Sequence, residues 1–164
     1  MKKITILTLL LFTSVNVIVS QNKNYQKEKD MTNKVEKTDE EWRNVLNDEE
    51  FRVLREKGTE YPHTGKYNLH FENGVYNCNG CKTPLFESNQ KFESDCGWPS
   101  FDDAIDGSIK YVKDYTHNME RTEILCVKCD GHLGHVFNDG PTETGLRYCV
   151  NSVSIDFNKN SNKE

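Results

Sequence analysis

Two short segments after residue 37 carry apolar residues at helical spacing, and each follows a helix-start signature. In a capping box, a polar side chain bonds the backbone three positions later, where a glutamate side chain bonds back. The two signatures are Thr38 with Glu41 and Asn47 with Glu50. The apolar residues that follow them are Trp42, Val45, Leu46, Phe51 and Leu54. We therefore predict two short helices, the second stopping at Gly58.

From Lys66 onward the apolar residues occur in short runs bounded by Gly, Asn, Asp and Pro, which is typical of strands joined by turns. The runs cover residues 74–76, 109–112, 123–125, 135–137 and 146–157. The pattern predicts a small, mainly β domain preceded by the two helices.

The last run has a period of two, which places Arg147, Cys149 and Asn151 on one face and apolar residues on the other. Beyond Asn151 the apolar phase changes. This predicts either a bulge near Ser152 or a strand that buries opposite faces in its two halves. Cys149 thus lies between a cation and an amide, and the neighbouring arginine favours a thiolate. An inert buried thiol is the alternative.

The N-terminus has the pattern of a secretory signal over residues 1–20, with Lys2 and Lys3 before an apolar stretch and Ser20 at a plausible cleavage point. We expect an exported protein, periplasmic or secreted, or a membrane-anchored one if the leader is not cleaved. Residues 21–37 are too polar to build a core and read as a tether. The folded domain is expected over residues 38–158, with a polar tail over 159–164.

Composition fits one small globular domain plus a tail, with 164 residues, 35% apolar and 29% charged. The net charge of −5 becomes −7 without the leader, because 19 basic residues then face 26 acidic ones. Nucleic acid is therefore not an expected partner, since phosphate binding needs a basic face. No stable membrane insertion is expected after cleavage of the leader.

The six cysteines divide into two Cys-x-x-Cys pairs and two single residues, Cys96 and Cys149. The pairs are Cys78 with Cys81 and Cys126 with Cys129. Four thiolates in two such knuckles are the usual tetrahedral ligands of a structural zinc ion. The ion would connect two distant turns, because 44 residues separate the pairs.

Two other arrangements of these cysteines remain open. Each pair could form a disulfide, since the leader points to an oxidising compartment. Alternatively, Cys126, Cys129, His132 and His135 could bind zinc by themselves, which would leave Cys78 and Cys81 without a role.

Three further residues suit an active site. His132 and His135 lie between glycines, and histidine is well suited to deliver a proton near neutral pH. Trp98 follows Cys96 in a Gly-Trp-Pro turn and could form the wall of a small apolar pocket. Surface or structural histidines and an ordinary core tryptophan are the alternatives.

Five motifs, taken together, resemble the peptide-methionine (R)-S-oxide reductases, the type B methionine sulfoxide reductases. They occupy residues 78–81, 94–101, 126–129, 132–141 and 147–152. The resemblance runs from about residue 38 to 158, in the same order and with compatible spacing. Asp95 and His63 depart from the family pattern, and neither touches the expected chemistry directly.

The resemblance implies a compact antiparallel domain of two sheets, with a zinc ion held by Cys78, Cys81, Cys126 and Cys129. Cys149 would attack the sulfoxide sulfur and become a sulfenic acid, and Cys96 would then form a disulfide with it. His132 and His135 would supply the proton. Arg147 and Asn151 would orient the site, while Trp98 and Phe137 would hold the methyl group of the substrate.

The implied partners are oxidised proteins or peptides that carry methionine-R-sulfoxide, and a thioredoxin-like reductant that reopens the disulfide. Two other functional classes are the alternatives to a methionine sulfoxide reductase. A disulfide oxidoreductase would place a Cys-x-x-Cys at a helix start, whereas here Cys78 and Cys126 follow strand-like runs. A zinc-knuckle binding module would give no reason for the two single thiols and the histidine pair.

Overall fold

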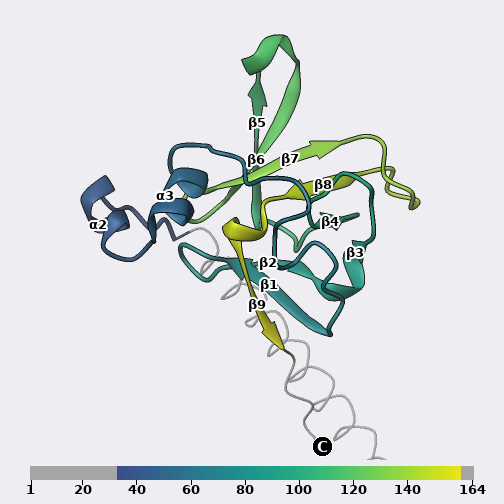
Figure 1. Ribbon diagram of the computed structural model, residues 1–164, viewed down its shortest axis with the longest axis horizontal. Helices are drawn as coiled ribbons and strands as arrows, with labels where there is room; N and C mark the ends of the chain where they lie inside the picture. Colours follow the sequence, from purple (N-terminus) through teal and green to yellow (C-terminus); the bar gives the residue numbers. More distant parts are fainter. Residues whose placement is uncertain (1–32, 160–164) are drawn as a thin grey trace, which may run out of the picture. The chain divides into compact units, whose positions relative to one another are not determined.

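Two capped helices begin the part of the chain that the computed structural model describes, residues 33–159 (Figure 1). They are α2 (Asp39–Arg43) and α3 (Asp48–Leu54), and both predicted capping boxes form, at Thr38 and at Asn47. Helix α2 ends before Val45, whose side chain is 57% exposed. Both helices are thus confirmed, although the first is shorter than its apolar pattern suggested and the second ends at Leu54, before the predicted stop at Gly58.

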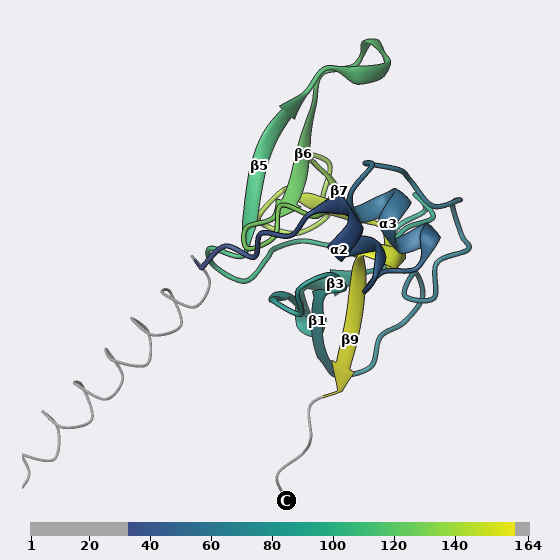
Figure 2. The ribbon, with the colours of Figure 1, turned by 90° about the vertical axis from the view of Figure 1, so that its left-hand side faces the viewer.

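Within residues 33–159, nine strands form two antiparallel sheets, as expected. The three-stranded sheet has the order β2 (Pro84–Glu87), β1 (Gly74–Cys78), β9 (Ile155–Lys159). The six-stranded sheet has the order β3 (Lys91–Phe92), β4 (Ser100–Phe101), β8 (Arg147–Val150), β7 (His132–Phe137), β6 (Arg121–Cys126), β5 (Ile109–Asp114). The β5–β6 hairpin extends beyond the rest of the domain (Figures 1 and 2).

Aromatic side chains join the two sheets in the core. Phe86 of β2 and Phe101 of β4 stack with their ring centroids 4.4 Å apart, and Tyr76 of β1 meets Phe101 edge-on at 5.1 Å. All three are fully buried, and fully burying one such ring stabilises a fold by about 1.5–3 kcal/mol. Trp42 and Leu54 bring the two helices into the same core.

The predicted run 146–157 is not one strand. It splits into β8 and β9, which belong to different sheets, and the 3₁₀ helix η3 (Ser152–Ser154) connects them. The change of apolar phase after Asn151 therefore marks a change of sheet. It marks neither a bulge at Ser152 nor one strand with two buried faces.

The predicted leader, most of the predicted tether and residues 160–164 lie outside the described residues. The end of the predicted tether contacts the domain, because the Val35 N–H donates to the Lys128 carbonyl at 2.7 Å and Lys34 pairs with Asp130. Lys159, expected in the tail, closes β9. Within residues 33–159, no helix is long and apolar enough to cross a membrane.

Candidate active site and metal site

Cys78, Cys81, Cys126 and Cys129 come together as one group, with all four sulfurs within 4.8 Å of one another. The Cys78–Cys129 and Cys81–Cys126 sulfur distances are 3.6 and 3.5 Å. A tetrahedral ion with Zn–S bonds of about 2.3 Å would place its sulfurs about 3.8 Å apart, so this group fits zinc closely. The four-cysteine metal site predicted from the sequence is thus geometrically complete.

The two knuckles repeat one backbone turn. In each, the N–H four residues after the first cysteine donates back to that cysteine's carbonyl, from Lys82 at 2.8 Å and from Asp130 at 2.9 Å. Lys82 and Asp130 have φ of 60° and 54°, the left-handed conformation that turns the chain sharply. Because Cys78 ends β1 and Cys126 ends β6, a metal here would connect the two sheets.

Neither alternative arrangement, the disulfides or the local Cys/His zinc site, forms in the described part of the chain. His132 and His135 bind carboxylates and do not belong to the cysteine group. All four knuckle cysteines have free thiols, and their close contacts run between the knuckles.

Cys149 and Cys96 are brought to a sulfur–sulfur distance of 3.7 Å. Cys149 lies on the central strand β8, directly opposite Ser100 of β4. The Ser100 and Ser94 hydroxyls lie 3.4 and 3.0 Å from the Cys96 sulfur. A disulfide between Cys96 and Cys149 would therefore need only a small approach of the two sulfurs.

The two thiols of this pair differ in acidity. The hydrogen bond with Cys149, aided by those from Ser100 and Ser94, lowers the pKa of Cys96 to about 4 despite burial. The same bond and burial raise the pKa of Cys149, although Arg147 opposes the shift. Within the pair, Cys96 is thus the more acidic thiol. Arg147 acts in the predicted direction, toward a Cys149 thiolate, but burial and the neighbouring sulfur outweigh it.

The two histidines share one face because β7 contains a bulge. In a regular strand, residues three apart point to opposite faces. Here Gly134 pairs with Ile124 while His132 pairs with Leu125, so one residue of β7 is extra. Gly134 has φ of 152°, and a Cβ there would clash with the carbonyl of the catalytic-site strand β8. The bulge brings the imidazole centroids to 5.7 Å from each other.

Carboxylates hold the two histidines by different nitrogens. His132 Nδ1 lies 2.7 Å from Glu123, which also accepts from Lys57 at 2.8 Å. His135 Nε2 lies 2.7 Å from Asp114, which also accepts from Arg121. Burial lowers the pKa of His135 although Asp114 opposes this. His132 thus keeps Nε2 free, and His135 keeps Nδ1 free.

A pocket of about 130 Å³ opens over Cys149. It is lined by Thr59, Trp98, Arg121, His132, Gly134, His135, Phe137, Cys149 and Asn151. His135 is the cross-strand partner of Cys149, so the two side chains are neighbours on one face of the sheet. Six of the eight residues proposed for catalysis or substrate binding therefore meet in one pocket, and Cys96 touches it through Cys149.

Arg147 lies beside the pocket, where Asp139 holds it. Its guanidinium donates twice to the Asp139 carboxylate, at 2.8 and 2.9 Å, and lies 4.6 Å from the centre of the Phe137 ring. Its charge still lowers the pKa of Cys149. Arg147 can therefore hold the Phe137 ring in position and, at the same time, favour the thiolate form of Cys149.

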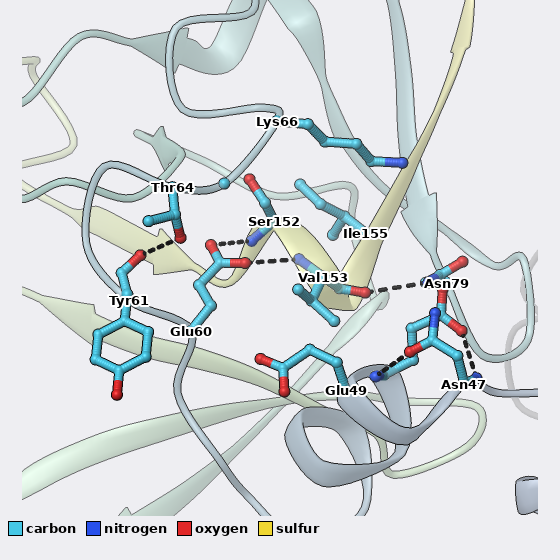
Figure 3. A pocket seen from close by; sticks show the side chains of 12 residues that line it. Asn47, Glu49, Glu60, Tyr61, Thr64, Lys66, Asn79, Ser152, Val153 and Ile155 are labelled. Carbon is cyan, nitrogen blue, oxygen red and sulfur yellow. Dashed lines mark hydrogen bonds between the residues drawn. The ribbon is translucent and has the colours of Figure 1, made fainter.

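A larger pocket of about 310 Å³ lies on the other side of η3 and contains no cysteine or histidine (Figure 3). The buried Glu60 carboxylate accepts there from the Ser152 and Val153 N–H groups, at 2.6 and 3.0 Å. The Glu60 backbone holds two residues that line the pocket over Cys149. The Glu60 N–H donates to Asn151 Oδ1, and the Trp98 indole donates to the Glu60 carbonyl. Glu60 thus fixes two walls of the pocket over Cys149.

Sequence reasoning missed the carboxylates Glu123, Asp114, Asp139 and Glu60. Glu123 lies opposite His135 in the sheet register, which only a strand alignment reveals. The odd spacing of the two histidines within a strand was the one local signal, because it requires a bulge for both to face one pocket.

Comparison with known proteins agrees with this geometry. The family model described as the SelR domain matches residues 46–159. The protein named peptide methionine sulfoxide reductase MsrB from Pseudomonas fluorescens is 56% identical over 125 residues, covering 76% of this chain and 96% of its own length. The protein of that name from Chromohalobacter salexigens is 54% identical over 129 residues, covering 77% of this chain and 97% of its own length.

Among solved structures, the crystal structure of the Mis18 "Yippee-like" domain aligns at 18% identity with a TM-score of 0.45, covering 56% of this chain and all of that one. This likeness is too weak to inform the site. The family match over residues 46–159, by contrast, includes the cysteine group and the pocket. The chain therefore belongs to the SelR family, with the MsrB methionine sulfoxide reductases, and is an oxidoreductase.

Proposed function

We propose that this enzyme reduces the R epimer of methionine sulfoxide, in oxidised proteins or peptides, by a thiol mechanism. The observation that carries the proposal is one small pocket that joins a thiol, two histidines and two aromatic walls, with a second thiol 3.7 Å from the first. The choice of the R epimer is supported by family membership.

In the first step, Cys149 attacks the sulfoxide sulfur as a thiolate. Burial and the hydrogen bond with Cys96 oppose this ionisation, whereas the charge of Arg147 favours it. His132 or His135 protonates the sulfoxide oxygen, so that oxygen passes to Cys149 as a sulfenic acid and methionine leaves. Trp98 and Phe137 hold the methyl group against the thiol.

In the second step, the Cys96 sulfur attacks the Cys149 sulfenic acid, which releases water and forms a disulfide. A thioredoxin-like dithiol then reduces this disulfide and becomes oxidised itself. The short sulfur–sulfur distance supports the assignment of Cys96 as the resolving thiol.

Zinc is the ion that we propose for the four-cysteine group. Four thiolates fill a tetrahedral zinc completely and leave no position for substrate, which supports a structural role. A metal there would join β1 to β6 and so hold the two sheets together.

Export by a signal peptide over residues 1–20 is also part of the proposal. It rests on the Lys2–Lys3 start and the apolar stretch that follows.

Turnover of the two sulfoxide epimers tests the substrate assignment. With dabsylated methionine sulfoxide and dithiothreitol, the purified enzyme should consume the R epimer and leave the S epimer essentially unchanged, as seen by chiral chromatography. The pocket is chiral, and only one epimer can present its methyl group to Trp98 and its oxygen to the histidines. Equal consumption of both epimers would refute the assignment.

Cys96→Ser should still release about one equivalent of methionine in a single turnover. The variant lacks the hydrogen bond that raises the pKa of Cys149, so this pKa should fall toward that of an ordinary thiol. The single-turnover rate of the variant at pH 7 should therefore be at least equal to that of the wild type.

Quenched-flow measurement of methionine release between pH 6 and 9 checks this result. Dividing the variant rate by the wild-type rate at each pH removes the pH effects that both proteins share. A variant rate well below the wild-type rate at pH 7 would show that Cys149 depends on the Cys96 sulfur to lose its proton. Failure to release any methionine in a correctly folded variant would reverse the assignment of the two thiols.

A further inference from the structure

The two sulfurs of the thiol pair open onto different cavities. The pocket of about 130 Å³ is lined by Cys149 and not by Cys96. A second cavity, of about 350 Å³, is lined by Cys96 and not by Cys149. Its other lining residues include Phe92, Glu93, Asp95, Asp139 and Arg147. We call this second cavity the Cys96 groove.

The two cavities differ in size, so they can bind different reaction partners. The smaller pocket has room for little more than one side chain, which suits a methionine sulfoxide. The Cys96 groove is larger, and the side chains of Glu93 and Asp95 on it are exposed. A thiol carried on a protein surface can therefore reach Cys96 more readily than Cys149, and access is one of the factors that decide which sulfur of a disulfide is attacked.

The charges around the groove indicate which kind of partner can bind there. Asp139 is neutralised by Arg147 at 2.8 Å, whereas neither Glu93 nor Asp95 forms an ion pair with any residue in the described range. Two exposed carboxylates without an ion pair thus line the same cavity as the Cys96 sulfur, although the charge of Glu93 also acts on Lys91. A negative rim favours the approach of a positively charged surface and slows a negative one.

We propose that the Cys96 groove is the docking face for the reductant, a dithiol with basic residues next to its reactive thiol, and that this thiol attacks Cys96. The proposal rests on the thiol mechanism proposed above. The reductant thiolate forms a bond to the Cys96 sulfur, the Cys96–Cys149 bond breaks, and Cys149 leaves as a thiolate. The second thiol of the reductant then displaces Cys96, so that two electrons pass to the enzyme and the reductant ends as a disulfide.

Matched dithiol peptides test the charge of the docking face. The full-length protein is first bridged between Cys96 and Cys149 with diamide, and the bridge is verified by peptide mapping. It is then reduced with Lys-Cys-Gly-Pro-Cys-Lys or Glu-Cys-Gly-Pro-Cys-Glu. At low salt the lysine peptide should react about tenfold faster, and added salt should reduce this difference.

Glu93→Lys combined with Asp95→Lys should reverse the preference between the peptides, while reduction by uncharged dithiothreitol should stay unchanged. Glu36→Lys combined with Asp106→Lys makes the same change of charge at exposed carboxylates outside the groove, and should keep the wild-type preference. An unchanged preference in the groove variant, or an equal loss in the control, would overturn the proposal.

The attacked sulfur is identified with Lys-Cys-Gly-Pro-Ser-Lys, which lacks the second thiol and traps the mixed disulfide. Mass spectrometry should find the peptide on Cys96, and finding it on Cys149 would overturn the proposal. Because diamide forms the bridge, this result is independent of sulfoxide chemistry. A failure of the proposed function would appear separately, as the absence of methionine release from sulfoxide in a single turnover.

Discussion

Cys149→Ser should abolish methionine sulfoxide reduction, with a loss of at least about 10³-fold in the single-turnover rate. A serine hydroxyl is not ionised near neutral pH and is a far weaker nucleophile toward sulfur than a thiolate. Cys149 is also the one cysteine that lines the pocket between Trp98 and the histidines, within the described part of the chain. No other thiol there can replace it at the sulfoxide.

The measurement is methionine release from the R epimer in a single turnover, with zinc content and circular dichroism checked on the same preparation. Cys96→Ser is the matched control, because it removes the neighbouring thiol 3.7 Å away and should keep the burst of methionine. Appreciable release by a folded Cys149→Ser variant would mean that the nucleophile lies elsewhere.

Cys126→Ser should lose both the metal and cooperative folding. Structural zinc in a thiolate site contributes on the order of 10 kcal/mol, which is comparable with the whole net stability of a domain of this size. Cys126 is fully buried at the end of β6, and its sulfur lies 3.5 Å from that of Cys81 in the other knuckle. Its loss therefore removes the connection between the sheets.

Plasma emission spectrometry should find one equivalent of zinc, and no iron, in the wild type and none in Cys126→Ser. Thermal unfolding of the variant should lack a cooperative transition. Cys96→Ser again serves as control, since it removes a cysteine outside the group and should keep the zinc and the transition. A metal-free Cys126→Ser protein that unfolds cooperatively and reduces sulfoxide would contradict a structural zinc.

The features that the sequence predicts well are those with local causes. The capping boxes at Thr38 and Asn47 form because donor and acceptor lie three residues apart in the chain. The cysteine group follows from a spacing that turns both thiols of a knuckle toward one ion. Strands β2, β3 and β4 escaped prediction. Strands β3 and β4 contain two residues each, too few for any period to appear, and the two buried residues of β2 are adjacent and do not alternate.

The features that could not be predicted depend on which strands become neighbours. Glu123 can hold His132 only because β6 pairs with β7 and because β7 contains an extra residue. Glu60 reaches Asn151 across 91 positions of sequence. Such contacts follow from the sheet order and the bulge, and neither is encoded in any short segment.

Because β8, η3 and β9 come last in the chain, they are also synthesised last. All four cysteines of the group precede Asp130, so they leave the ribosome before the strand that carries Cys149. The three-stranded sheet is complete only when β9 has joined β1, about 80 residues after β1 was made. A nascent chain can therefore assemble the four-cysteine group early, but it brings Cys149 next to Cys96 only when its last strands have been synthesised.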